Sequence, residues 1–322
     1  MKTVPLPRIC LFLLCIIWSC GKDTCCDDPP TPEAFTAPSA QEFTDLLEST
    51  RDSLAVNISF PATEGLEYIS RNGTTITIPS DCLITPEGNP LEGEVTLKFI
   101  ELYDIGDMLF TAKPSIARVS ANLRTLIAGG GFFYLNLEYN GQSLRNSCEI
   151  RIQVPVSLTS DTPEDMLLWT GAENEENHFS WFPYTEGELF NENDYYIAYV
   201  SGNGWKGIAH TDTDAVSGIT INVLATEGYN EQNASVYVAF EGRKHTLAQL
   251  YFDEETSMFR TPEHQYFSDT DMHLLFVSPD NGQWRYAIKN VKAQTGKIYT
   301  VAHSETTRAN RSALWSAIQQ LP

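Results

Sequence analysis

The chain has 322 residues, of which 42% are hydrophobic and 20% are charged, a composition typical of a folded protein of one or two domains. Its 42 acidic residues outnumber its 21 basic residues, so the formal net charge is −21. This balance argues against nucleic-acid binding and against electrostatic docking on anionic lipid, because both require a basic surface.

The first 19 residues have the organisation of a secretory signal peptide. Lys2 and Arg8 precede the uncharged run ICLFLLCIIW, which is too short for a membrane-spanning helix. The sequence IWSC that ends at Cys20 resembles the lipobox of bacterial lipoproteins, in which the cysteine becomes the lipidated first residue of the mature chain. The resemblance implies cleavage after Ser19 and an acyl (palmitate) anchor in the membrane through Cys20. An ordinary secretory peptide with an incidental cysteine is the alternative.

Residues 20–38 are expected to form a tether. They contain four prolines among small polar residues, which is typical of a semi-rigid spacer. Lys22-Asp23 and Asp27-Asp28 resemble the charged stretch that marks surface export of lipoproteins in the Bacteroidota, so we expect an outer-membrane, surface-exposed protein. Cys25 and Cys26 lack the second cysteine or histidine pair that a zinc site needs, so no metal is expected there.

A helix and then a long series of strands follow the tether. Ser39 and Glu42 form a capping-box pattern, which predicts a helix over residues 39–54. Beyond it, apolar residues alternate with polar ones, and turn sequences recur about every ten residues, a pattern typical of antiparallel sandwiches. We therefore predict a mainly β protein with two consecutive antiparallel β-sandwich domains. The expected segments are a first sandwich over 55–156, a linker over 157–165, a second sandwich over 166–303 and a C-terminal helix over 304–322.

Three local features lie inside the first expected sandwich. Arg71-Asn72-Gly73 and Asn140-Gly141 are hairpin-turn sequences. Residues 104–110 are expected to form a single helical turn between two strands.

Two segments of the first sandwich carry a family resemblance. GTTITIPSDCLITPEGNPLEGEVTLKFIELYDIGDMLF, residues 73–110, and AGGGFFYLNLEYNGQSL, residues 128–144, resemble the first β-domain of a type of Bacteroidota envelope lipoprotein. That domain is similar to ZU5-like sandwiches. The resemblance extends over roughly residues 55–320 and implies a ZU5-like fold for residues 55–156, a second β-sandwich domain after it and a place in the cell envelope. The chain departs from the family at Gly131 and at residues 206–208. The resemblance implies no defined activity, and no functional residue is transferred from it.

Two cysteines fall in the first expected sandwich. Cys82 and Cys148 are candidates for a disulfide bond, which the oxidising envelope permits. Two buried free thiols that pack as small hydrophobic groups are the alternative.

Five aromatic residues in the second half are candidates for a binding surface. Exposed tryptophan and tyrosine side chains stack on sugar rings or anchor protein partners. Filling of a hydrophobic core is the alternative. The five residues are Trp169, Trp181, Tyr184, Tyr196 and Trp205.

The chain lacks the sequence motifs of common catalytic sites. It has no H-E-x-x-H metal motif, no G-x-S-x-G nucleophile elbow and no P-loop, so we expect no enzyme, no cofactor and no metal. The predicted function is non-catalytic binding of an unidentified protein or glycan by a lipid-anchored envelope protein. The alternatives are a structural, fimbrillin-type pilin subunit that assembles by strand addition, and a hydrolase that acts on a surface polymer.

Overall fold

The apolar alternation of the chain produces a mainly β fold, with three α-helices among the described residues, which confirms the predicted fold class. The computed structural model describes residues 35–321 except residues 86, 122, 145–148, 160–164, 212–218, 264, 266–270 and 295. The expected signal peptide, Cys20 and nearly all of the tether lie outside the described residues. Thr36–Pro322 form one compact unit, and the description below concerns that unit.

The helices are short and begin at capped positions. Their bounds are α1 Ala40–Leu54, α2 Ile105–Thr111 and α3 Arg311–Gln319. Three 3-10 turns accompany them: η1 Ser80–Cys82, η2 Val156–Leu158 and η3 His303–Glu305. The predicted capping box is present at α1, where the Ser39 side chain and the Glu42 carboxylate each bond the other residue's backbone N–H. The predicted helical turn at residues 104–110 corresponds to α2.

In the part of the chain that the structure describes, twenty-one strands form three sheets. Sheet 1 has the order β1-β4-β6-β13-β9-β10-β5, with β7 paired to β6. Its strands are β1 Val56–Pro61, β4 Glu94–Leu102, β5 Ile116–Ser120, β6 Leu123–Tyr139, β7 Gln142–Ser143, β9 Leu167–Glu173, β10 Phe179–Pro183 and β13 Gly204–Thr211. The pairing is antiparallel except between β10 and β5.

Sheets 2 and 3 take the remaining strands. Sheet 2 has the order β11-β12-β8-β3-β2 and contains β2 Leu66–Ile69, β3 Thr75–Ile78, β8 Glu149–Pro155, β11 Glu188–Glu192 and β12 Tyr195–Ser201. Sheet 3 has the order β20-β14-β17-β16-β15-β18-β19-β21. Its strands are β14 Asn222–Ala225, β15 Ser235–Phe240, β16 Arg243–Asp253, β17 Met258–Arg260, β18 Asp271–Asp280, β19 Gln283–Lys292, β20 Ile298–Val301 and β21 Thr307–Ala309. Only the β14–β20 pair of these two sheets is parallel.

Sheets 1 and 2 form a sandwich. The odd-numbered residues Val95, Leu97 and Phe99 of β4 face Ile76, Ile152 and other residues of sheet 2 in one buried cluster. The next residues on the opposite face of β4, Ile100 and Leu102, belong to a second cluster. This alternation buries both faces of sheet 1, since successive side chains of a strand point to opposite sides.

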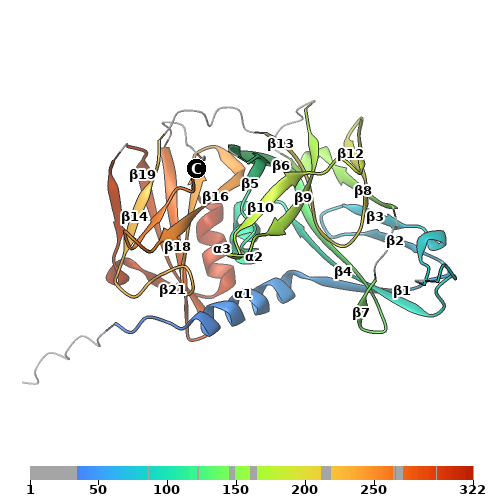
Figure 1. Ribbon diagram of the computed structural model, residues 1–322, viewed down its shortest axis with the longest axis horizontal. Helices are drawn as coiled ribbons and strands as arrows, with labels where there is room; N and C mark the ends of the chain where they lie inside the picture. Colours follow the sequence, from blue (N-terminus) through green and yellow to red (C-terminus); the bar gives the residue numbers. More distant parts are fainter. Residues whose placement is uncertain are drawn as a thin grey trace, which may run out of the picture. The chain divides into compact units, whose positions relative to one another are not determined.

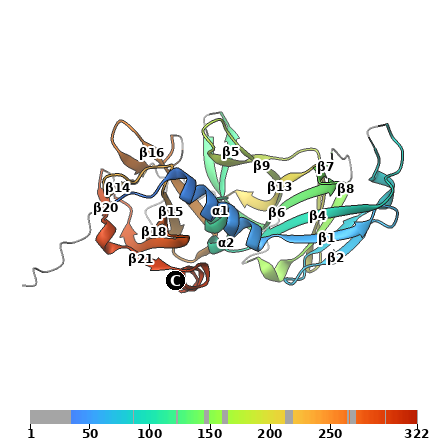
Figure 2. The ribbon, with the colours of Figure 1, turned by 90° about the horizontal axis from the view of Figure 1, so that it is seen from below.

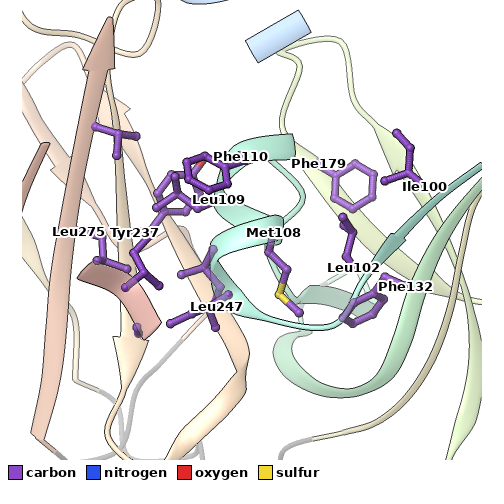
Figure 3. Packing of buried hydrophobic residues seen from close by; sticks show 14 of the residues in the cluster. Ile100, Leu102, Met108, Leu109, Phe110, Phe132, Phe179, Tyr237, Leu247 and Leu275 are labelled. Atoms are coloured by element: carbon purple, nitrogen blue, oxygen red, sulfur yellow. The ribbon is translucent and has the colours of Figure 1, made fainter. Parts of the chain in front are cut away.

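The second cluster joins sheet 1, the three helices and sheet 3. Figure 1 shows α2 and α3 between sheet 3 and sheet 1, and Figure 2 shows α1 running across α2. In the close view of Figure 3, Met108 and Phe110 of α2 lie between Leu247 of sheet 3 and Phe132 of sheet 1. All four of these residues are at most 1% exposed. The helices therefore contribute to one hydrophobic core that lies between sheet 1 and sheet 3.

The expected division at residues 157–165 does not separate the sheets. Strands β9, β10 and β13 follow this segment but pair within sheet 1, and β11 and β12 pair within sheet 2. The change of sheet falls instead between β13 and β14. A period-two pattern identifies a strand but not its partners. The sequence therefore predicts the strands of residues 167–211 without showing that they pair with strands of the first half.

The expected C-terminal helix over residues 304–322 is too long at its start. Residues Thr307–Ala309 form β21 at the edge of sheet 3, and α3 begins only at Arg311. The side chain of Asn310 accepts a hydrogen bond of 2.9 Å from the Ala313 N–H, which fixes the first turn of the helix.

Candidate functional site

A cleft of about 650 Å³ opens where the end of α1, strand β4, helix α2 and helix α3 meet. This volume falls within the range of small-molecule sites, about 300–1,000 Å³. Its lining includes three acidic and two basic side chains together with an exposed tryptophan. We call this region the helix cleft. The polar residues used below are Ser70, Arg71, Asn72, Glu101, Asp104, Asp107, Arg311 and Trp315.

The turn after β2 forms one wall of the helix cleft. Ser70 Oγ accepts hydrogen bonds from the backbone N–H groups of Asn72 and Thr74, at 3.2 and 3.1 Å. Gly73 completes the turn with a φ of +94°, a conformation that side chains with a Cβ rarely adopt. The turn predicted at Arg71-Asn72-Gly73 is therefore present, and it holds Arg71 and Asn72 at the cleft.

Glu101 fastens this turn to β4. Its carboxylate accepts hydrogen bonds from Ser70 Oγ at 2.9 Å, Thr74 Oγ1 at 2.9 Å and Asn72 Nδ2 at 2.8 Å. Burial raises the pKa of Glu101, and these three donors oppose that shift by stabilising the charged form. Since both carboxylate oxygens are already engaged, Glu101 positions the wall of the cleft.

Asp104 and Asp107 stand at the first turn of α2. Asp104 is the N-cap, and its Oδ1 accepts a hydrogen bond of 2.9 Å from the Asp107 N–H. Burial and the neighbouring Asp104 charge raise the pKa of Asp107 to about 7, whereas Arg311 acts in the opposite direction. Among the described residues, no group donates a hydrogen bond to the Asp107 carboxyl. This carboxyl is therefore able either to accept or to donate a hydrogen bond to a ligand near neutral pH.

The charges of the helix cleft are nearly balanced. Arg71 and Arg311 line the cleft together with the acids, and Arg311 Nη1 also donates to Ser53 Oγ of α1 at 3.0 Å. Because Asp107 is partly protonated, the negative charge of the three carboxyl groups is close to the positive charge of the two guanidinium groups. This balance suits an uncharged polar ligand better than a phosphate or a polycation.

Trp315 supplies an aromatic face at the edge of the cleft. Its side chain is 40% exposed, and it lies against the start of α2. A Cβ placed on Gly106 would meet Trp315 Cδ1 at 2.9 Å and Asp104 Oδ1 at 3.0 Å. The absence of a side chain at residue 106 thus allows the tryptophan ring to approach the helix.

The predicted aromatic binding surface is wrong. Trp169, Trp181 and Tyr196 are at most 1% exposed and Trp205 is 7% exposed, whereas Tyr184 is half-buried against the first core cluster. Their polar atoms serve the interior: the indole N–H of Trp169 donates to the Ala209 carbonyl and that of Trp181 to the Pro114 carbonyl, both at 2.9 Å. Trp169, Trp181 and Trp205 lie in the second core cluster and Tyr196 lies in the cluster between sheets 1 and 2, as the alternative interpretation of core filling held.

The predicted cysteine pair is described on one side only. Cys82 is disulfide-bonded, at the end of η1. Cys148, its expected partner, lies outside the described residues, as does Cys20. The pairing of Cys82 with Cys148 stays a prediction.

No sequence motif identifies the residues of the helix cleft as a site. The pattern ELYDIGD places acids at positions 101, 104 and 107, where they interrupt an otherwise apolar segment. Acidic residues flanked by buried aliphatic ones are a signal of a polar site at the edge of a core. Arg311 and Trp315 lie about 200 residues further along the chain, and only the packing of α3 on α2 brings them to the same place.

Comparisons with known proteins assign no function to the chain, so a function has to be argued from the geometry of the cleft. Neither a protein-family model nor a curated protein matches the chain. Among the residues that the structure describes, no group of three or more histidine, cysteine, aspartate or glutamate side chains is placed to hold a metal ion. None of the described helices has the length and apolar character needed to cross a membrane.

Proposed function

We propose that this chain is a lipid-anchored envelope protein that binds a neutral glycan in the helix cleft without chemical conversion. The observation that carries the proposal is the meeting of Asp107, Arg311 and the exposed face of Trp315 in one cleft. Carboxylate and guanidinium groups form hydrogen bonds with sugar hydroxyls, and a tryptophan face packs on the apolar side of a sugar ring. The balanced charge favours an uncharged oligosaccharide over an anionic one.

Titration of the full chain with neutral oligosaccharides tests the binding site. Trp315→Ala is expected to weaken binding about fivefold, because stacking on an aromatic face contributes about 1 kcal/mol. Tyr195→Ala is a matched control, since Tyr195 is also an exposed aromatic, at 39%, and does not line the cleft. Equal losses in the two variants, or no binding of any neutral oligosaccharide, would contradict the proposal.

The membrane address rests on the sequence alone and needs its own test. Cys20→Ala is expected to abolish acylation and to release the chain from the membrane fraction of bacterial cells that export it. Cys25→Ala, five residues further along the chain, is expected to leave both unchanged. A Cys20→Ala chain that stays acylated and membrane-bound would refute the anchor.

Hydrolysis of a surface polymer is a second candidate, because carboxyl groups converge in this cleft. Asp107, with its pKa raised to about 7 by burial and by Asp104, has the character of a general acid. Glu101 is held by three hydrogen bonds, which leaves Asp104, whose Oδ1 accepts the Asp107 N–H, as the other carboxylate of the cleft. Release of reducing sugar by the full chain, lost in Asp107→Asn, would favour hydrolysis over simple binding.

The helices next to the terminal edge strands argue against the pilin alternative. Strand addition needs an edge strand near a terminus that can leave its sheet. β1 and β21 are edge strands near the ends of the described chain, but each is joined to a helix: β1 follows α1 and β21 precedes α3. Leu314 and Ile318 of α3 are at most 1% exposed, so releasing β21 together with its helix would open the second core cluster.

A further inference from the structure

A second cavity, of about 200 Å³, lies beside the helix cleft and shares Tyr103 and Asp104 with it. Strands β15, β16 and β18 of sheet 3 form one side, and the end of α3 forms the other. We call it the histidine cavity, because His245 and His273 both contribute to its wall. It plays no part in the function proposed above.

The two histidines lie on the same face of sheet 3. Ala239 of β15 is opposite His273 on one neighbouring strand and opposite Leu247 on the other. The β16 ladder is irregular between Arg243 and Leu247, and His245 is placed on this side by its contact with the Tyr103 carbonyl oxygen and by its share of the cavity wall. That side faces the helices, since Ala239 and Leu247 belong to the second core cluster.

Each histidine has one ring nitrogen engaged and the other available as an acceptor. His273 Nδ1 lies 2.7 Å from Asn290 Oδ1, and His245 Nδ1 bonds the Tyr103 carbonyl oxygen. Amide and carbonyl oxygens only accept, so each Nδ1 carries a proton, and in the neutral imidazole Nε2 presents a lone pair.

His273 Nε2 is the unusual atom of this cavity. The His273 side chain is only 4% exposed, and its Nε2 is buried without a hydrogen-bond partner among the described residues. A buried acceptor left without a donor costs about 1–3 kcal/mol, and such groups are rare in folded proteins. A bound molecule with a hydroxyl group would supply the missing donor.

The remaining walls define the rest of the ligand. Ile318 and Leu321 provide an apolar surface, and the two basic residues Arg243 and Lys244 outnumber the single acidic residue of the wall, Asp104. The Arg243 guanidinium lies 5.9 Å from the centroid of the Phe240 ring, which keeps it at the wall. A cavity of about 150 Å³ accommodates a benzene ring, so this one has room for a ring with two small substituents.

We propose that the histidine cavity binds a small monocyclic hydroxy acid. Its ring packs on Ile318 and Leu321, its hydroxyl donates to His273 Nε2, and its carboxylate faces Lys244.

Calorimetric titration of the full chain with 4-hydroxybenzoate, benzoate and phenol tests this site. 4-Hydroxybenzoate is expected to bind about tenfold more tightly than benzoate, because only the former offers a donor to His273. His273→Phe is expected to remove that difference. Lys244→Ala is expected to weaken 4-hydroxybenzoate and to leave phenol unchanged, whereas Lys297→Ala, an exposed lysine outside the cavity, changes neither.

A second measurement on the unaltered chain makes the test independent of how the variants fold. The imidazole ¹⁵N resonance of His273 Nε2 is expected to shift when 4-hydroxybenzoate is added and not when benzoate is added. Absence of 4-hydroxybenzoate binding at millimolar concentration, equal affinities for the two acids, or an unmoved His273 resonance would overturn the proposal. Trp315→Ala is expected to leave 4-hydroxybenzoate binding intact, which separates this site from the helix cleft.

Discussion

Asp107 links the stability of the fold to pH. Burial and Asp104 raise its pKa from 3.8 to about 7, so between those values the folded state holds a proton that the unfolded state has lost. Stability from this group is complete below about pH 4 and is lost as the pH rises through about 7. Asp107→Asn is therefore expected to raise the free energy of unfolding by about 1–3 kcal/mol at pH 8.

Urea unfolding at pH 8 and at pH 4 measures this effect. At pH 4 the difference between Asp107→Asn and the unaltered chain is expected to disappear, because the aspartate is then protonated in the folded state. A difference of the same size at both pH values would show that the variant acts through packing and not through ionisation.

Lys113 shows the cost of leaving a charge without its partner. Its side chain is 5% exposed, its Nζ lies 2.6 Å from Glu173 Oε1, and it lies 4.7 Å from the Phe179 ring centroid. Burial lowers the pKa of Lys113, and Glu173 opposes that shift. Glu173→Gln is expected to destabilise the fold by about 2 kcal/mol, since the buried ammonium loses its carboxylate.

Lys113→Met is expected to change stability by less than about 1 kcal/mol. The methionine stem fits the same apolar surroundings, and the Glu173 side chain, 48% exposed, is free to be hydrated. Chemical denaturation at pH 7 gives both values. The idea fails if Lys113→Met is the more damaging of the two substitutions.

At the level of elements, the contact between α2 and α3 depends on a missing side chain. An alanine in place of a helical glycine usually stabilises a helix by about 1 kcal/mol. At Gly106 we expect the opposite sign, a loss of about 1 kcal/mol, because the new Cβ would lie 2.9 Å from Trp315 Cδ1 and force the ring away. Thermal unfolding followed by tryptophan fluorescence reports both the loss and the movement of the ring.

A double-mutant cycle isolates this contact. In a Trp315→Ala background, Gly106→Ala is expected to become neutral or stabilising, since the obstructing ring is gone. An unchanged loss in that background would assign the effect to Asp104, whose Oδ1 lies 3.0 Å from the same position.

Elements with a local cause were predictable from the sequence, and their partners were not. The capping box at Ser39, the turn at Asn140-Gly141 and the helical turn after Tyr103 each depend on a few adjacent residues. The pairing of β13 with β6 and the burial of Trp169, Trp181 and Trp205 depend on contacts between residues far apart in the chain. The helix cleft belongs to the second kind, because α1, α2 and α3 reach it from three distant segments.

At the level of the whole molecule, the second core cluster links the two halves of the chain. Phe110 of α2 is 1% exposed and packs on Trp284 of sheet 3, with ring centroids 5.4 Å apart. The same cluster contains Ile100 and Phe132 of sheet 1. Two independent sandwich domains would unfold in two steps, whereas a shared core predicts one cooperative transition for residues 36–322.

Phe110→Ala distinguishes these cases. It is expected to cost about 3–5 kcal/mol, because a buried aromatic ring is lost and a cavity remains between the β layers. Since α2 supports both layers, the transition of the whole chain is expected to move to lower temperature as one step, with equal calorimetric and van't Hoff enthalpies. Differential scanning calorimetry of the unaltered chain and of Phe110→Ala checks this. A second transition that stays at its original temperature in the variant would show that sheet 3 folds independently of the sandwich formed by sheets 1 and 2.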